Sequence, residues 1–439
     1  MLVRQVKSPT GKAARHRLQV LVLLAPVLAL PSCSTVQSVK TAVLGGGSTT
    51  PQVLSGFIGG AAADDPRAAL AARDVLATGG NAADAAVAAA FMMSVSLPSR
   101  ASLGASGACL AYKPGDVSPQ AILFEPTPGG PGGDRPAAVP MLARGLFLLN
   151  ARYGSRDFAS LIAPAETAAR EGIPASRALV EDLNDVAAPL LADPSSAAIF
   201  APNGAPLAVG DTLIQPDLGA MLGQIREFGV GDFYDGALAT NLIAAVKSAG
   251  GGAVSIDTLR NALPTVASPI IVEQAGNSVA FVPGEGGLAA SAALTGAISP
   301  AAAELPASTS LIVVDGKGDA VGCAFSMNNL FGTGRLAPGT GIVLGASPLH
   351  KPNPLIAVAI AWKPGLNAFR AAAAGTGQAA APAAAAAAMS AALQGSIAPI
   401  VPDPGRYNVA SCDQYLPGND KSCHFATDPR GAGLATASD

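Results

Sequence analysis

The segment at 307–329, ASTSLIVVDGKGDAVGCAFSMNN, constrains the fold more than any other part of the chain. Two apolar runs of strand-forming residues flank a tight turn at 315–318, and this pattern predicts a buried hairpin. The hairpin begins with two small hydroxyl residues, Ser308 and Thr309. Residues of this kind commonly do no more than begin a strand after a turn. They would gain a chemical role if the backbone were cut before Ser308, because that residue would then carry both a free amine and a nucleophilic hydroxyl.

The composition allows a large core of closely packed small side chains. Half of the 439 residues are apolar, but only 4% are aromatic, and glycine is abundant. Such a core suits stacked sheets and alanine-rich helices. Charged residues make up 13% of the chain and the net charge is −3, so no basic surface for nucleic acid is expected. The length fits one large domain or two ordinary ones.

The N-terminus has the pattern of an export signal over residues 1–33. A basic stretch precedes the apolar run Leu18–Leu30, which is shorter than the ~20 residues of a membrane span but suits a signal peptide. The run ends in LPSC, similar to a bacterial lipobox in which Cys33 would carry lipid. An ordinary secretory signal or an uncleaved anchor is the alternative. The polar, Gly/Ser/Thr-rich residues 34–60 are expected to form a flexible tether. From the signal pattern and the lipobox together, we expect an exported protein of the bacterial periplasm or envelope, anchored to the membrane through lipidated Cys33.

The four remaining cysteines have two different expected roles. Cys412 and Cys423 bracket a turn-rich loop, and an oxidising compartment would let them form a disulfide, with two free thiols as the alternative. Cys109 and Cys323 lie in small-residue apolar runs and are interpreted as small buried hydrophobic residues. The three histidines lie far apart and have no zinc-like spacing, so neither a metal nor an organic cofactor is expected.

Helical patterns dominate the first half of the chain and strand patterns the second, which predicts an α+β fold with layers of both. The alanine-rich stretch at 377–395 could be a disordered linker, but alanine is the best helix former and a buried helix is the preferred interpretation. The other predicted helices cover 66–77, 82–95, 141–153, 158–170, 176–192, 216–228, 236–249 and 288–299. Strands are predicted at 109–112, 120–125, 268–274, 278–284 and 354–365, with a hairpin series over 307–345.

Four segments in the correct order resemble the γ-glutamyltranspeptidase (glutathione hydrolase) family of N-terminal-nucleophile hydrolases. They are DPRAALAARDVLATGGNAADAAVAAAFMMSV at 65–95, the helical stretch at 143–176, the long segment at 209–251 and FATDPRGAGLA at 425–435. The resemblance implies an αββα layered sandwich. It also implies autocleavage between residues 307 and 308, into a large-subunit-like region at 61–307 and a small-subunit-like region at 308–439.

The same resemblance assigns a nucleophile. The family cuts itself before a residue that opens a strand ending in Val-Val-Asp, and aligning Val313-Val314-Asp315 places Ser308 at that position. The freed α-amino group would act as the base, because its pKa near 8 leaves much of it neutral at working pH. Thr309 is the nucleophile in the alternative register.

Four further residues match family positions. Ser326 matches the hydroxyl residue that hydrogen-bonds the nucleophile, and Asn328 matches an asparagine that contacts substrate. Gly377 and Gln378 fall at the Gly-Gly of the oxyanion hole, where amides at a helix N-terminus face a developing negative charge. Gln378 would need a backbone conformation usually left to glycine.

The sequence departs from the family at the residues that bind substrate. Glu125 occupies the segment where an arginine would hold the glutamyl α-carboxylate, so a carboxylate would be repelled there. Arg135 or Arg100 could take its place in space. The family's Met-Asp-Asp stretch is missing, its Ser-Ser pair falls on Ile356-Ala357, and the chain is shorter between Ser299 and Ser308.

Two functions therefore remain open, because function depends on the site and not on the fold. The retained Ser308, Ser326 and Asn328 favour an exported γ-glutamyltranspeptidase-like hydrolase or acyltransferase. It would act on γ-glutamyl (glutathione-like) or related small-molecule amides through an acyl-enzyme. The altered substrate-binding residues favour a catalytically impaired relative that serves as a non-enzymatic envelope lipoprotein.

Overall fold

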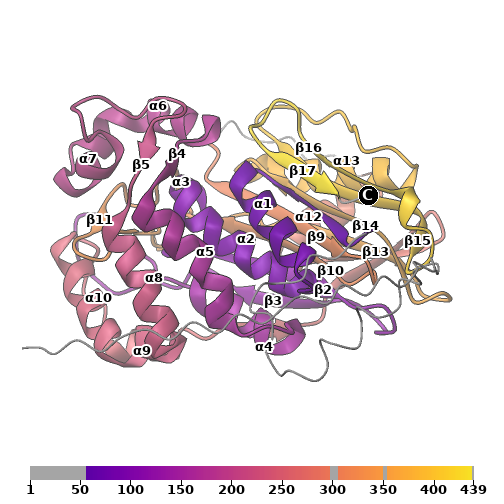
Figure 1. Cartoon of the computed structure of the whole chain (residues 1–439), viewed down its shortest axis with the longest axis horizontal. Coiled ribbons are helices and arrows are strands. Elements are labelled where there is room, and N and C mark those ends of the chain that lie inside the picture. The colour runs from indigo at the N-terminus through magenta and orange to yellow at the C-terminus, as the bar shows by residue number, and fades with distance from the viewer. Residues whose placement is uncertain (1–55, 297–304, 350–352, 438–439) are drawn as a thin grey trace, which may run out of the picture. The chain divides into compact units, whose positions relative to one another are not determined.

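The computed structural model describes residues 56–296, 305–349 and 353–437, which build layers of helices and sheets (Figure 1). The predicted signal peptide, most of the predicted tether and Cys33 lie outside these residues. No helix in the described part of the chain is long and apolar enough to cross a membrane.

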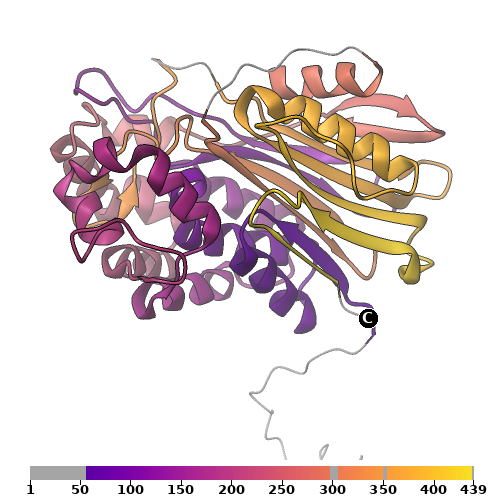
Figure 2. The same cartoon turned by 90° about the horizontal axis from the view of Figure 1, so that it is seen from above.

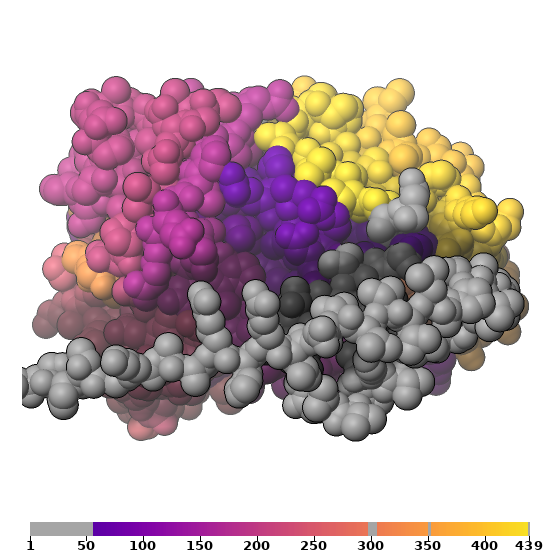
Figure 3. All heavy atoms as spheres, in the orientation of Figure 1, coloured from indigo at the N-terminus to yellow at the C-terminus, as the bar shows by residue number. Residues whose placement is uncertain are grey.

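The predicted hairpin forms the centre of a sheet. Within the described residues this sheet has seven strands in the order β17-β1-β9-β10-β2-β3-β6, and every neighbouring pair is antiparallel. Figure 3 shows the indigo start of the described chain against its yellow C-terminal part, where β1 pairs with β17. The strands are β1 (Gly59–Ala63), β2 (Ser106–Tyr112), β3 (Gln120–Phe124), β6 (Thr265–Ala267), β9 (Ser308–Asp315), β10 (Ala320–Ser326) and β17 (Leu434–Ala437).

A second antiparallel sheet, six-stranded in the described chain, follows the order β16-β15-β14-β13-β8-β7. The sequence predicted β7, β8 and β13 but not the strands after them. For β14 the reason is its alanine-rich sequence AFRAAAAGT, which carries little strand propensity. The strands are β7 (Ile270–Gln274), β8 (Asn277–Phe281), β13 (Ala357–Lys363), β14 (Ala368–Thr376), β15 (Arg406–Leu416) and β16 (Cys423–Thr427).

The two sheets pack face to face, with a helical layer outside each (Figure 2). Ile312 and Val314 of β9 share one buried core with Val358 and Ile360 of β13. Leu311 and Val313, on the opposite face of β9, belong to a different core, with the helices on the outer side of the first sheet. Helices α12 (Glu285–Leu294) and α13 (Ala381–Leu393) cover the second sheet. This arrangement confirms the expected αββα sandwich.

Helix α2 (Ala82–Ser96) shows how the alanine-rich sequence serves the packing. Asn81 and Asp84 form a reciprocal capping box at its start, and every residue of the helix is buried. An all-round apolar helix is a core helix, and its small side chains permit close approach of α1 (Pro66–Ala77) and α5 (Phe158–Glu171). Helix α1 has the predicted bounds, with Asp65 as its N-cap.

The remaining elements lie mostly to one side of the sheets. Helix α13 confirms the preferred interpretation of 377–395, whereas α12 begins and ends earlier than the predicted 288–299. The others are α3 (Pro98–Ala101), α4 (Leu142–Tyr153), α6 (Arg177–Leu191), α7 (Pro194–Phe200), α8 (Pro216–Phe228), α9 (Val230–Asp235), α10 (Ala237–Ser248) and α11 (Ile256–Asn261), with short strands β4 (Ile173–Pro174), β5 (Thr212–Leu213), β11 (Leu336–Ala337) and β12 (Ile342–Val343).

The cysteines correct one prediction and confirm another. Cys412 and Cys423 form the predicted disulfide between β15 and β16. Cys109 and Cys323 are buried as expected, but they are joined by a disulfide and are not simply small hydrophobic residues of the core. They lie directly opposite each other on β2 and β10, a register that the sequence alone did not reveal.

Candidate active site

Ser308 is the first residue of β9 and is 3% exposed. Because side chains alternate along a strand, Ser308 lies on the face of Ile312 and Val314, toward the second sheet. Its hydroxyl oxygen accepts a hydrogen bond from the backbone N–H of Gly377 at 3.1 Å and a longer one from that of Gln378 at 3.5 Å. The structure therefore brings the predicted nucleophile to the predicted oxyanion donors.

The donor loop has an unusual backbone that explains its geometry. It follows β14 and enters α13 through a short 3-10 turn at 378–380. Gly377 has φ +104°, and a Cβ at this position would lie 2.7 Å from the carbonyl oxygen of Pro404. Gln378 has φ +54°, which is the glycine-like conformation that the sequence required of it. This backbone directs two successive amides at the Ser308 hydroxyl.

The carbonyl of the bond before Ser308 is held separately. The Ser326 hydroxyl donates to the Ala307 carbonyl oxygen at 3.1 Å, and the N–H of Met327 donates to the same oxygen at 3.1 Å. Ser326 pairs with Ser308 across the β9–β10 ladder, and this pairing brings the Ser326 hydroxyl close to the Ala307 carbonyl oxygen. The Ala307–Ser308 bond thus has two donors on its carbonyl oxygen beside the hydroxyl that could attack it.

Thr309 lies on the opposite face of β9, because adjacent strand residues point to opposite sides. Its hydroxyl donates to the Asp64 carboxylate at 3.0 Å and lies 3.4 Å from the sulfur of Met93 in α2. No hydrogen bond among the described residues joins it to Gly377 or Gln378. The structure does not bring Thr309 to the donor loop, so the geometry favours the register with Ser308.

Asp64 and Asn408 brace the start of β9, and sequence reasoning missed this role for both. The Asp64 carboxylate accepts from the N–H of Ser310 at 3.1 Å and from the side-chain amide of Asn408 at 2.8 Å. The same Asn408 amide also donates to the Ser310 hydroxyl, which links the two sheets. Burial raises the pKa of the Asp64 carboxyl, although these donors act in the opposite direction. The sequence did contain one signal for Asp64. Two aspartates precede α1, and only Asp65 is needed as the helix N-cap, so the other was available for a different role.

Asn328, the predicted substrate contact, is held near Ser326. Its backbone N–H donates to the Ser326 hydroxyl at 2.9 Å, and its side-chain amide approaches the Ala346 carbonyl at 3.5 Å. The residue is 3% exposed and has φ +62°, a strained conformation that asparagine tolerates better than most residues. A buried residue with such a backbone beside a reactive group suits a role at a site.

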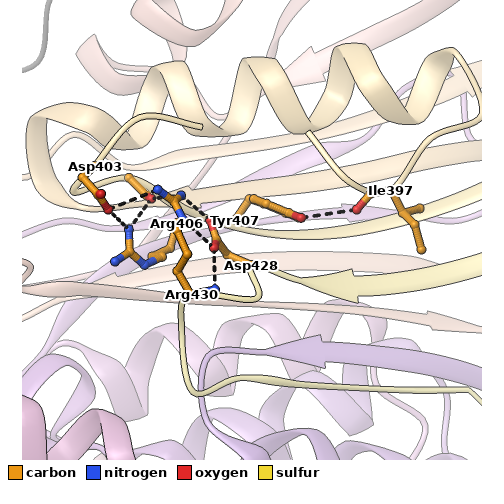
Figure 4. Close-up of polar contacts among 7 residues, drawn as sticks. Ile397, Asp403, Arg406, Tyr407, Asp428 and Arg430 are labelled. Carbon is orange, nitrogen blue, oxygen red and sulfur yellow. Dashed lines mark hydrogen bonds and ion pairs between the residues drawn. The ribbon is translucent and has the colours of Figure 1, made fainter. Parts of the chain in front are cut away.

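An ion-pair network fixes the loop that contacts Gly377 (Figure 4). Arg406 and Arg430 both donate to the Asp403 carboxylate, at 2.7 and 3.1 Å, and to the Gly405 carbonyl, at 2.8 and 2.9 Å. Arg430 also makes a two-point contact with Asp428. The network anchors the segment around Pro404, against which Gly377 packs.

A cavity of about 280 Å³ opens beside this network. Pro306, two residues before the nucleophile, and Pro404 both line it. Its lining includes three guanidinium groups and six carboxyl groups, those of Arg100, Arg406, Arg430, Asp64, Glu181, Asp182, Asp185, Asp403 and Asp428. The lining of the cavity therefore contains more acidic than basic side chains.

The two arginines considered as replacements for the family arginine both already have partners, although Arg100 also lines the cavity described above. Arg100 makes a two-point ion pair with Asp182 at 2.5 and 2.8 Å. Arg135 donates to the Thr333 carbonyl at 2.9 Å. Glu125 lines a small cavity of about 30 Å³ together with Pro354 and Ile356. Glu125 and Ile356, which the resemblance matches to the family's arginine and to one of its Ser-Ser pair, thus line the same small cavity. Among the described residues, no group of three or more His, Cys, Asp or Glu is arranged to hold a metal.

Comparison with known sequences identifies relatives over about half of the chain. The profile of the family described as Gamma-glutamyltranspeptidase matches residues 68–299. A glutathione hydrolase proenzyme of Bacillus subtilis is 32% identical over 252 residues, covering 53% of this chain and 43% of the relative. Glutathione hydrolase 2 of Arabidopsis thaliana is 29% identical over 245 residues, covering 53% of this chain and 42% of the relative. The chain thus spans less than half the length of these curated relatives.

Comparison with solved structures extends over both sheets. The cephalosporin acylase of Bacillus halodurans superposes with a TM-score of 0.69 at 19% identity, covering 89% of this chain and 97% of the acylase. At this identity the likeness establishes the fold and leaves the chemistry to be argued from the site.

Proposed function

Because the chain belongs to the γ-glutamyltranspeptidase family, we propose that it is a self-processing amide hydrolase or acyltransferase with Ser308 as its N-terminal nucleophile. One observation carries this proposal: the Ser308 hydroxyl lies against two amides of the Gly377–Gln378 loop, while the preceding carbonyl is held by Ser326 and Met327. Two sets of donors at one serine suit two successive acyl transfers.

The first transfer is the cut itself. The Ser308 hydroxyl oxygen attacks the Ala307 carbonyl carbon, and the negative charge that develops on the oxygen is stabilised by Ser326 and Met327. The carbon–nitrogen bond then breaks and the nitrogen takes up the proton that the hydroxyl has lost, leaving an ester on the serine and a free amine on the same residue. Water hydrolyses the ester, so that Ala307 ends as a carboxylate and Ser308 begins a new chain.

The second transfer is turnover of a substrate. The new α-amino group, with an ordinary pKa of ~8, takes the proton of the Ser308 hydroxyl as it attacks an amide carbonyl. The Gly377 and Gln378 amides face the oxyanion, and the amine leaving group takes the proton. Water or an acceptor amine then releases the acyl group from the serine.

The charges around the site define the substrate class we propose. The resemblance matches Glu125 to the arginine that holds the carboxylate of a γ-glutamyl donor, so an acid there opposes an acyl group that carries a carboxylate. The acidic cavity beside Pro306 and Pro404 favours a leaving group or acceptor that carries an amine. The substrates are therefore related amides with an uncharged acyl group, and γ-glutamyl compounds are turned over weakly.

We also propose that the protein works outside the cytoplasm, held at the membrane through Cys33. Support comes from the signal-like residues 1–33 and from two disulfides, because disulfides persist in oxidising compartments. The alternative, a non-enzymatic envelope lipoprotein, is supported by Glu125 and by the altered Ile356-Ala357 pair.

Matched chromogenic amides test the enzyme proposal. Glutaryl and butyryl p-nitroanilides differ by one terminal carboxylate, and γ-glutamyl p-nitroanilide represents the family substrate. We expect kcat/KM to be highest for the butyryl compound and to vanish in Ser308→Ala. Glu125→Arg should raise kcat/KM for the two carboxylate donors at least ~10-fold, equivalent to about 1.4 kcal/mol, with Glu125→Gln as the neutral control. If the wild type hydrolyses none of the three amides faster than Ser308→Ala does, the result favours the non-enzymatic role.

A further inference from the structure

The Cys109–Cys323 disulfide joins two parts of the chain on opposite sides of the Ala307–Ser308 bond. The two cysteines are 214 residues apart in sequence and directly opposite in the β2–β10 ladder. Both are 0% exposed and lie in the core between the first sheet and its helices. A cut before Ser308 would leave Cys109 on the first product and Cys323 on the second.

We propose that this disulfide makes the mature protein a covalently joined two-chain molecule, an inference that rests on the proposed self-cleavage. The fold supports it independently. In the first sheet, β9 and β10 of the second product lie between β1 and β2 of the first, in the order β1-β9-β10-β2. In the second sheet, β8 of the first product pairs with β13 of the second. The products are thus interleaved, and the disulfide crosses one of the boundaries between them.

The second disulfide provides an internal control. Cys412 and Cys423 are 11 residues apart, and both lie after the cut, so their bond cannot join the products. Cys423 is 9% exposed and lines a cavity with Lys421 and His424, whereas Cys109 and Cys323 have no exposed surface. A reductant should therefore open the 412–423 bond in the folded protein and reach the 109–323 bond only after denaturation.

The bond has a chemical and a mechanical consequence. Its formation removes two protons and two electrons from the thiols of Cys109 and Cys323, and a disulfide oxidant such as oxidised glutathione accepts them and becomes two thiols. Once formed, the bond keeps the products at a high effective concentration for each other. Unfolding of the cut protein then leaves one molecule, and refolding does not require two chains to meet.

Denaturing gels with and without dithiothreitol test this inference on the full chain. We expect one band for the wild type without reductant and two bands with it, the smaller corresponding to 308–439. Cys109→Ala with Cys323→Ala should give two bands even without reductant. Cys412→Ala with Cys423→Ala should behave like the wild type. Non-reduced peptide mapping of the wild type should recover Cys109 and Cys323 in one linked peptide pair, which needs no variant to fold.

Each other outcome has a distinct meaning. Two wild-type bands without reductant would overturn the covalent link and leave the proposed self-cleavage intact. A linked peptide pair together with one band under both conditions would show that the disulfide forms in an uncleaved chain. The proposed self-cleavage would then be wrong, and the two-chain molecule would be wrong with it. Free Cys109 and Cys323 thiols in the unreduced, denatured protein would overturn the link regardless of the cut.

Discussion

Replacing Ser326 with alanine tests the account of the cut most informatively. The substitution removes one of the two donors to the Ala307 carbonyl oxygen and leaves the Met327 amide in place. Loss of a single oxyanion donor commonly slows acyl transfer by ~100- to 1,000-fold, or about 2.7–4 kcal/mol of transition-state stabilisation. We expect Ser326→Ala to slow the cut within that range, but not to abolish it.

A stability effect must be separated from this kinetic effect. Ser326 also accepts the N–H of Asn328 at 2.9 Å, and a buried donor left unpaired costs about 1–3 kcal/mol of the free energy of unfolding. Ser106→Ala is the matched control, because Ser106 lies opposite Ser326 in the β2–β10 ladder and is also buried. Its hydroxyl donates to the Ser326 carbonyl at 3.4 Å and makes no hydrogen bond to Ala307 within the described chain.

The assay is a pulse-labelled cell-free synthesis, followed over time on reducing gels, with thermal melting of each purified variant. Ser106→Ala should be cut at a rate within ~3-fold of the wild type, and Ser326→Thr should retain most of the rate because it keeps the hydroxyl. If Ser326→Ala is cut as fast as Ser106→Ala, the carbonyl contact has no catalytic role and the reasoning fails.

Three further predictions use other contacts. Thr309→Ala should still be cut before Ser308, but its free energy of unfolding in denaturant should fall by about 1–3 kcal/mol, because the lost hydroxyl donates to Asp64. Loss of cleavage in this variant would instead favour Thr309 as the nucleophile. Gly377→Ala should lower kcat/KM of the cut protein at least ~10-fold, because the new Cβ would lie 2.7 Å from the Pro404 oxygen and displace the amide donors of this loop. Gly365→Ala is the control, because its Cβ would enter open space and should leave kcat/KM unchanged. Asp319→Asn should flatten the pH dependence of unfolding: burial and the nearby Asp315 raise the pKa of Asp319 from 3.8 to about 6. The folded wild type therefore binds the proton more tightly than the unfolded chain and loses stability as pH rises from ~4 to ~7; equal slopes for variant and wild type would contradict this.

Local patterns predicted much of the fold. The period of apolar residues and the caps located α1, α2 and the β9–β10 hairpin, because those signals act over a few residues. The alanine-rich strand β14 carried no comparable signal, since its strand conformation depends on pairing with β13 and β15.

The candidate site was predictable only where its residues lie in recognisable motifs. Ser308, Ser326 and the Gly377–Gln378 loop were found in this way, and the structure brings them together. Asp64 and Asn408 were missed, because their contact joins residues 344 positions apart and depends on how the two sheets stack. The pairing of Cys109 with Cys323 likewise follows from strand register, which no short pattern reveals.

The mass and N-terminal sequence of the reduced, denatured wild-type protein test the central claim most directly. The account predicts two chains, the smaller one starting at Ser308 with a free amine, and a single uncut chain in Ser308→Ala. A wild-type protein that remains one chain across 307–308, or whose second chain begins at Thr309, would contradict it.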